Sequence, residues 1–197
     1  MNAFRHLSGA AWLGLLLAVP SPAAVDVFDF IPAGGRTLLA QVLVSRPAEG
    51  EVRGLTAQKR TRDEWQTYLQ SHAKAVPAMQ RLSDKEQRTL ADYLAYNMPL
   101  PAAQVPANLA QANWEKVLPP DGRDFALEYC QNCHIITVVV TQDRSKDAWL
   151  GSMSKPSHIQ IKLTREQRDA LASYLVLNAA IPIDQVPEEL RAGGATY

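Results

Sequence analysis

The sequence Cys130-Gln131-Asn132-Cys133-His134 contains the only two cysteines of this 197-residue chain. It has the form C-x-x-C-H, which is typical of covalent haem attachment. Two thiols at this spacing can each add to one vinyl group of a haem, and the histidine that follows is then held beneath the iron as its proximal ligand. We therefore expect Cys130 and Cys133 to attach one haem c per chain, with His134 as an iron ligand.

Two other uses of a C-x-x-C pair are less consistent with the surrounding sequence. A thiol–disulfide redox pair is usually found in a βαβ context, whereas the flanks of this motif are helical in pattern and show no strand–helix alternation. A structural zinc site needs four ligands, and with two cysteines and four histidines such a site would have to be assembled from scattered residues.

The first 24 residues have the pattern of a secretory signal peptide. Arg5 supplies a positive charge, 10–19 (AAWLGLLLAV) is an apolar core, and small residues after Pro20 offer a cleavage site. The apolar core is shorter than the ~20 residues that a spanning helix needs, although an uncleaved anchor is the alternative. The C-x-x-C-H motif resembles that of c-type cytochromes, and this resemblance implies that haem attachment is completed outside the cytoplasm. We therefore expect a periplasmic protein that leaves the membrane once 1–24 is cleaved.

The charge balance excludes one class of partner. The chain has 20 basic and 20 acidic residues, so its formal net charge is zero. Such a chain offers no basic field for binding nucleic acid. Motifs for nucleotide binding, serine hydrolysis or zinc proteolysis are also missing from the sequence. We therefore do not expect an independent enzyme.

An internal repeat predicts two domains of related structure. Equivalent residues recur 84 positions apart at the tryptophan and 81 positions apart from Leu82 onward. The matched positions are Arg60, Trp65, Leu82, Leu90, Tyr93, Leu94, Asn97, Pro101, Gln104, Pro106 and Leu109 in the first copy, and Arg144, Trp149, Leu163, Leu171, Tyr174, Leu175, Asn178, Pro182, Gln185, Pro187 and Leu190 in the second. We expect an all-α fold with domains at 25–110 and 111–197.

Each copy is expected to end in a capped helix and to begin with another. Ser83 and Thr164 each precede a Glu or Gln by three residues, which is a capping box. Apolar residues then follow at helical spacing. In the second copy, Asp121 is the expected N-cap of a helix that leads into Cys130. Aligning Arg36 with Arg123 places Leu43, Arg46 and Pro47 where Cys130, Cys133 and His134 stand. The first domain therefore lacks a haem attachment motif.

This order of features resembles the class I cytochrome c domain, most closely that of cytochrome subunits serving periplasmic dehydrogenases. The dihaem subunit of quinohaemoprotein amine dehydrogenase and the cytochrome subunit of sulfite dehydrogenase are examples. The resemblance covers about 112–190 directly and 30–110 only through the repeat. It implies that the first and last helices of the domain cross beside the haem, which would place Phe125 or Ala126 against Tyr174.

The sixth iron ligand is less clear than the other site residues. The family usually offers a methionine ahead of the last helix, and Met153 is the only methionine after the haem motif. A methionine at such a place is also a common core residue. His158 is the alternative ligand, and an open sixth position is the third possibility. His72 and Met79 of the first copy have no attachment motif beside them and are expected to be structural.

The resemblance implies electron transfer between redox partner proteins. We expect a subunit that accepts electrons from a periplasmic dehydrogenase and passes them to an acceptor cytochrome or an oxidase, with the haemless domain as a docking surface. One alternative is a free soluble shuttle that retains a duplicated domain. The other is a haem-based ligand binder or sensor, which requires an open sixth position.

Overall fold

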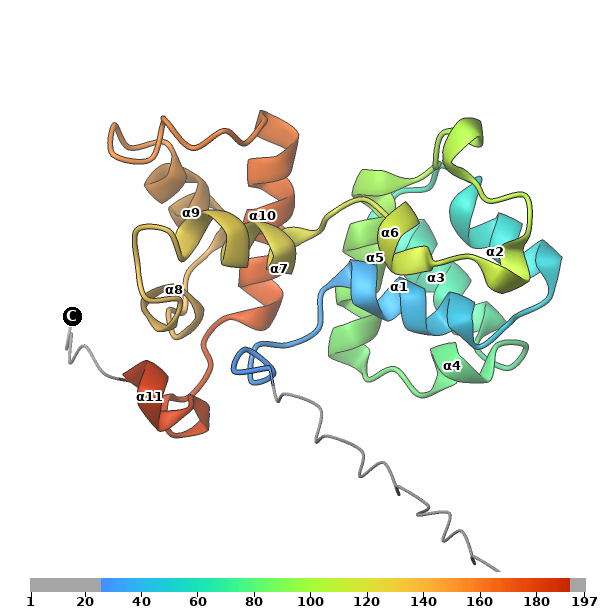
Figure 1. The fold of residues 1–197 in the computed structure, drawn as a ribbon, viewed down its shortest axis with the longest axis horizontal. Helices are drawn as coiled ribbons and strands as arrows, with labels where there is room; N and C mark the ends of the chain where they lie inside the picture. Colours follow the sequence, from blue (N-terminus) through green and yellow to red (C-terminus); the bar gives the residue numbers. More distant parts are fainter. Residues whose placement is uncertain (1–25, 192–197) are drawn as a thin grey trace, which may run out of the picture.

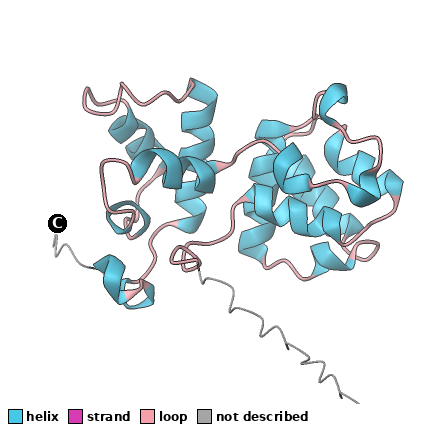
Figure 2. Ribbon diagram, viewed as in Figure 1, coloured by secondary structure: helices cyan, strands magenta, loops and turns pink. Residues whose placement is uncertain are grey.

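The computed structural model describes residues 26–191, and within this range every regular element is a helix (Figure 2). The expected all-α class is confirmed for this part of the chain, whereas the proposed signal peptide lies outside it. None of these helices is long and apolar enough to cross a bilayer. The α-helices are α1 (Gly35–Val44), α2 (Glu49–Thr56), α3 (Arg62–His72), α4 (Pro77–Gln80), α5 (Asp84–Asn97), α6 (Trp114–Val117), α7 (Gly122–Phe125), α8 (Thr137–Val140), α9 (Lys146–Met153), α10 (Arg165–Asn178) and α11 (Glu188–Arg191).

The structure has two lobes, with α1–α6 in one and α7–α11 in the other (Figure 1). Both expected capping boxes are present. Ser83 Oγ accepts from the backbone N–H of Glu86 at the start of α5, and Thr164 Oγ1 accepts from that of Gln167 at the start of α10. These caps satisfy backbone donors that the first turn of a helix leaves free. The long helices α5 and α10 therefore begin where the sequence predicts.

The two lobes have separate hydrophobic cores. The chain just before α7 packs into the core of the first lobe, and the chain just before α1 packs into the core of the second lobe. Trp114 and Leu118 are buried in the first core, while Ile31 is buried in the second. The hydrogen bonds show the same exchange. Tyr93 Oη of α5 donates to the carbonyl of Pro119 (2.8 Å), and Tyr174 Oη of α10 donates to the carbonyl of Pro32 (2.6 Å).

This reciprocal exchange joins the lobes, and polar contacts between α5 and α10 add to it. The side-chain amide of Asn178, which is buried, donates to Thr89 Oγ1 (3.0 Å). Lys146 at the start of α9 forms an ion pair with Asp169 of α10 (2.8 Å) and donates to Tyr96 Oη of α5 (3.2 Å). Buried donors and acceptors are costly to leave unpaired. These contacts therefore favour one fixed arrangement of the two lobes.

One carboxylate caps a helix in each lobe. Asp121 precedes α7, as the sequence predicts, and its Oδ1 accepts from the backbone N–H groups of Arg123 (2.8 Å) and Asp124 (3.0 Å). Its Oδ2 accepts from the backbone N–H of Arg36 in the first turn of α1 (2.8 Å). The counterpart of Asp121 in the first repeat is Gly34, which has no side chain and cannot cap α1. The second repeat therefore supplies the cap that the first one lacks.

We expect Asp121→Ala to lower the free energy of unfolding by about 2–3 kcal/mol, because it removes the caps of two helices at a buried position. The control is Thr61→Ala, which removes the exposed N-cap of α3 alone and should cost about 1 kcal/mol. Chemical denaturation of both variants measures the difference. Equal losses in the two variants would contradict the double capping role.

Candidate haem-binding site

The C-x-x-C-H motif begins at the end of an irregular helix. Helix α7 continues directly into a π-helix at Ala126–Cys130, and π-helices are rare and frequently found at functional sites. A turn follows, in which the N–H of His134 donates to the carbonyl of Cys130 (3.0 Å). The sequence predicted an ordinary helix up to Tyr129, so the π-helical turn is a correction. Cys130 is the last residue of this turn.

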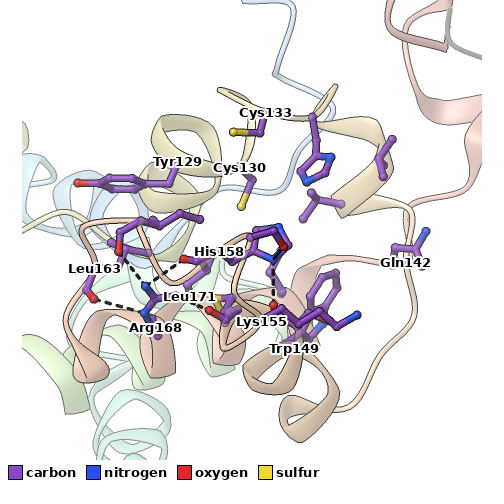
Figure 3. Close-up of a pocket in the computed structure, with 18 of the residues that line it drawn as sticks. Tyr129, Cys130, Cys133, Gln142, Trp149, Lys155, His158, Leu163, Arg168 and Leu171 are labelled. Atoms are coloured by element: carbon purple, nitrogen blue, oxygen red, sulfur yellow. Dashed lines mark hydrogen bonds between the residues drawn. The ribbon is translucent and has the colours of Figure 1, made fainter.

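The three motif side chains line one cavity of about 440 Å³, which is within the size range of small-molecule and cofactor sites. Figure 3 shows Cys130 and Cys133 on one side of this cavity and Trp149, Leu171 and Arg168 on the other. The walls are largely apolar. The apolar lining residues include Val138, Val139, Trp149, Met153, Ile161, Leu163, Leu171 and Leu175.

The surroundings of Cys130 differ from those of the attacking thiol in a thiol–disulfide redox pair. Burial, and to a smaller extent the Cys133 thiol, raises the pKa of Cys130 to about 11. Redox-active C-x-x-C motifs instead lower the pKa of the attacking thiol, because the thiolate is the nucleophile. A half-buried thiol in an apolar wall fits a residue that becomes a thioether.

The residues that the structure describes also do not form a structural zinc site. They contain no group of three or more His, Cys, Asp or Glu side chains placed to hold a metal ion. The cavity instead offers two thiols and one imidazole from the motif, a second imidazole from His158 and an apolar surround. This set of groups suits a tethered, planar, largely apolar cofactor with an iron centre. The residues present therefore fit haem c.

Both candidates for the sixth ligand line this cavity. Met153 is the last residue of α9 and is buried. His158 lies in the connection between α9 and α10 and is half-buried. The ring centres of His134 and His158 are 5.9 Å apart, and the two ring planes make an angle of 43°.

Arg168 of α10 was not singled out by the sequence analysis, although it holds the connection that carries His158. Its guanidinium donates to the backbone carbonyls of Met153 (2.7 Å), His158 (3.4 Å), Ile161 (2.7 Å) and Leu163 (3.3 Å). Figure 3 shows this residue at the floor of the cavity. The sequence did contain a clue to this role, because the counterpart of Arg168 in the first repeat is Gln87. The Gln87 side chain donates to a single carbonyl, that of Leu82.

The residues of the first lobe that correspond to the inner wall of the cavity are packed in a hydrophobic core. Trp65 and Leu69, the counterparts of Trp149 and Met153, are 0% and 1% exposed in a core that also contains Val52 and Leu55. Leu43, at the position of Cys130, is buried in the same core. The counterparts of the three motif residues, Leu43, Arg46 and Pro47, instead line a separate hollow of about 970 Å³, which contains no cysteine and no histidine.

His72 and Met79 of the first lobe lie away from this cavity lining. The ring of His72 stacks on Tyr68, and its Nδ1 contacts the carboxylate of Glu51 (2.8 Å). The Met79 side chain is 1% exposed in the first core. Both placements agree with the structural roles expected from the sequence.

Comparison of the chain with protein-family models, with curated proteins and with solved structures found no match in any of the three.

Proposed function

We propose that this protein transfers electrons through one haem c attached to Cys130 and Cys133, with His134 as an iron ligand. The observation that carries the proposal is the convergence of the C-x-x-C-H side chains and His158 on one apolar cavity. A bound haem supplies an iron that changes oxidation state without binding a substrate. The two lobes are proposed to be tandem cytochrome c-like domains, of which only the second carries haem.

The residues of this chain would set the reduction potential rather than perform chemistry on a substrate. Apolar walls such as Leu171 and Val139 keep water from the cofactor, and burial is one of the factors that tune haem potentials. Electron transfer, rather than catalysis, is the function that these residues support.

We propose further that the protein is the cytochrome subunit of a periplasmic dehydrogenase complex. The first lobe has a filled core and no cysteine, so it contributes no second redox centre of this kind. A diffusing carrier has no need of such a lobe, whereas a subunit can use it as a docking surface. Its contacts with the second lobe through α5 and α10 would hold a docked partner at a fixed distance from the cavity.

We expect the mature protein to co-purify from periplasmic extracts with a dehydrogenase, and the complex to reduce the haem when the substrate of that dehydrogenase is added. Tagged full-length protein, affinity capture and an absorbance assay of haem reduction provide the measurement. Recovery of a haem-containing monomer that exchanges electrons with several unrelated donors would instead identify a free shuttle.

A further inference from the structure

We propose that His158 is the second axial ligand of the haem iron, so that the iron is held between two imidazoles, His134 and His158. This inference rests on the proposed function, since it presupposes haem c at Cys130 and Cys133. It concerns the residue that completes the coordination, for which the sequence favoured Met153.

The spacing of the two rings is that of two imidazoles on opposite sides of one metal ion. An imidazole nitrogen binds a transition metal at about 2.0 Å, and the ring centre lies roughly 1 Å behind it, so two opposed rings have centres roughly 6 Å apart. The ring centres of His134 and His158 are 5.9 Å apart. The two ring planes make an angle of 43°.

The hydrogen bond of the His158 ring leaves its other nitrogen available. Nδ1 lies 2.9 Å from the carbonyl oxygen of Ser152, which only accepts, so Nδ1 donates and the neutral ring has its lone pair on Nε2. A histidine that binds a metal typically donates its other N–H to a backbone carbonyl or a carboxylate, which fixes the tautomer and the direction of the ring. His158 has this second-shell arrangement already.

The backbone around His158 is also held in place. The Arg168 guanidinium donates to carbonyls on both sides of His158 and to that of His158 itself. The N–H of His158 donates to the carbonyl of Lys155 (2.8 Å), which closes a turn. A ligand on a loop needs this support, because an unrestrained segment loses conformational entropy when it binds. Arg168 therefore acts as a positioning residue for His158.

Met153 has a structural explanation that does not involve iron. Its counterpart in the first repeat, at the offset of 84 that aligns Trp65 with Trp149, is Leu69. Leu69 is an ordinary core residue of a lobe that has no haem attachment motif. Each residue lies on the helix that carries the tryptophan shared by the two repeats: Leu69 lies on α3 and Met153 on α9. Both repeats therefore have an apolar side chain at this place. His158 has no histidine counterpart in the first repeat: the aligned residue is Lys74 at the offset of 84 and Pro77 at the offset of 81.

Two imidazole ligands would give the site different properties from those of a His/Met site. Thioether ligation raises the reduction potential of a haem, so a bis-histidine haem is expected to be easier to oxidise. Its iron has no open coordination position for carbon monoxide. The natural electron donors would accordingly be of low potential, and the ligand-sensor alternative would be excluded.

The test begins with the unmodified holoprotein, produced with covalently attached haem. We expect a low-spin ferric spectrum without the weak long-wavelength sulfur-to-iron band, and no spectral change when carbon monoxide is added to the reduced protein. Electron paramagnetic resonance should show the signature of two imidazole ligands. The presence of the sulfur-to-iron band would overturn the proposal without any variant.

Two substitutions separate the candidates. His158→Ala should convert the iron to a high-spin or carbon monoxide-binding form, and free imidazole should restore the low-spin spectrum, which a misfolded protein would not show. Met153→Leu, which installs the residue found at the equivalent position of the first repeat, should retain the low-spin spectrum without a sulfur-to-iron band. A low-spin spectrum that persists in His158→Ala would overturn the proposal, as would loss of the low-spin form in Met153→Leu.

Failure of this inference is distinguishable from failure of the proposed function. Haem staining after denaturing electrophoresis reports covalent attachment independently of the sixth ligand. A stained band with a His/Met spectrum contradicts the role of His158 alone. A band without stain in the unmodified protein contradicts the proposed function itself.

Discussion

Replacing both Cys130 and Cys133 with alanine will abolish covalent haem, because no thiol then remains to form either thioether bond. The two residues are the only cysteines of the chain, so no other side chain can take their place. Haem staining after denaturing electrophoresis is the readout, and the expected loss is complete. The same reasoning predicts one haem per chain, which a pyridine haemochrome assay measures against the protein concentration.

The matched control for this variant lies within the motif itself. Gln131 stands between the two cysteines and is exposed, so Gln131→Ala should retain the stained band. A coloured band in the double-cysteine variant would contradict the assignment of the attachment site. A count of two haems per polypeptide would contradict the expectation that the first lobe carries none.

The features that the sequence predicted well are those decided by neighbouring residues. A capping box depends on two side chains three positions apart, and both Ser83 and Thr164 cap as predicted. Helix type follows from the spacing of apolar residues over one or two turns. The haem motif is also local, and haem attachment at Cys130 and Cys133 stays a prediction.

The features that the sequence did not predict depend on contacts between distant segments. Nothing in the residues around Asp121 indicates that its carboxylate also caps α1, which is 85 positions away in sequence. The exchange of Ile31 and Leu118 between the two cores has the same origin, since an apolar residue before a helix can pack on either lobe. The direction of His158 depends on Arg168, and the aperiodic segment between α9 and α10 gives no pattern from which to infer it.

The crossing of α7 and α10 depends on a glycine that the sequence analysis overlooked. The family resemblance drew attention to Phe125 and Ala126 as partners of Tyr174, and all three residues are buried in the second core. The structure adds Gly122, whose backbone lies directly against the Tyr174 side chain. Gly35 has the same relation to Tyr93 in the first lobe. In each lobe, the close approach of two helices requires a residue without a side chain at this point.

Gly122→Ala should therefore destabilise the protein by about 3 kcal/mol, at the upper end of the range for overpacking a core. An added Cβ would collide with the Cβ of Tyr174 and lie 3.1 Å from the backbone carbonyl oxygen of Ala170. Neither atom can move away by a change of rotamer, so α7 and α10 would have to separate. For a chain of this size, the loss corresponds to a fall in Tm of roughly 10 °C.

Gly151→Ala is the matched control, since Gly151 lies inside α9 and an added Cβ would meet nothing within 4 Å. Alanine has the higher helix propensity, so this variant should be more stable than the unmodified protein by up to about 1 kcal/mol. Thermal unfolding of the two variants side by side then compares the same chemical change at a packed and at an open position. The changes in Tm should have opposite signs in the two variants, because Gly122 lies where two helices touch and Gly151 does not. A Tm of Gly122→Ala equal to that of the unmodified protein would show that α7 and α10 can separate without cost, and that this crossing does not hold the second lobe together.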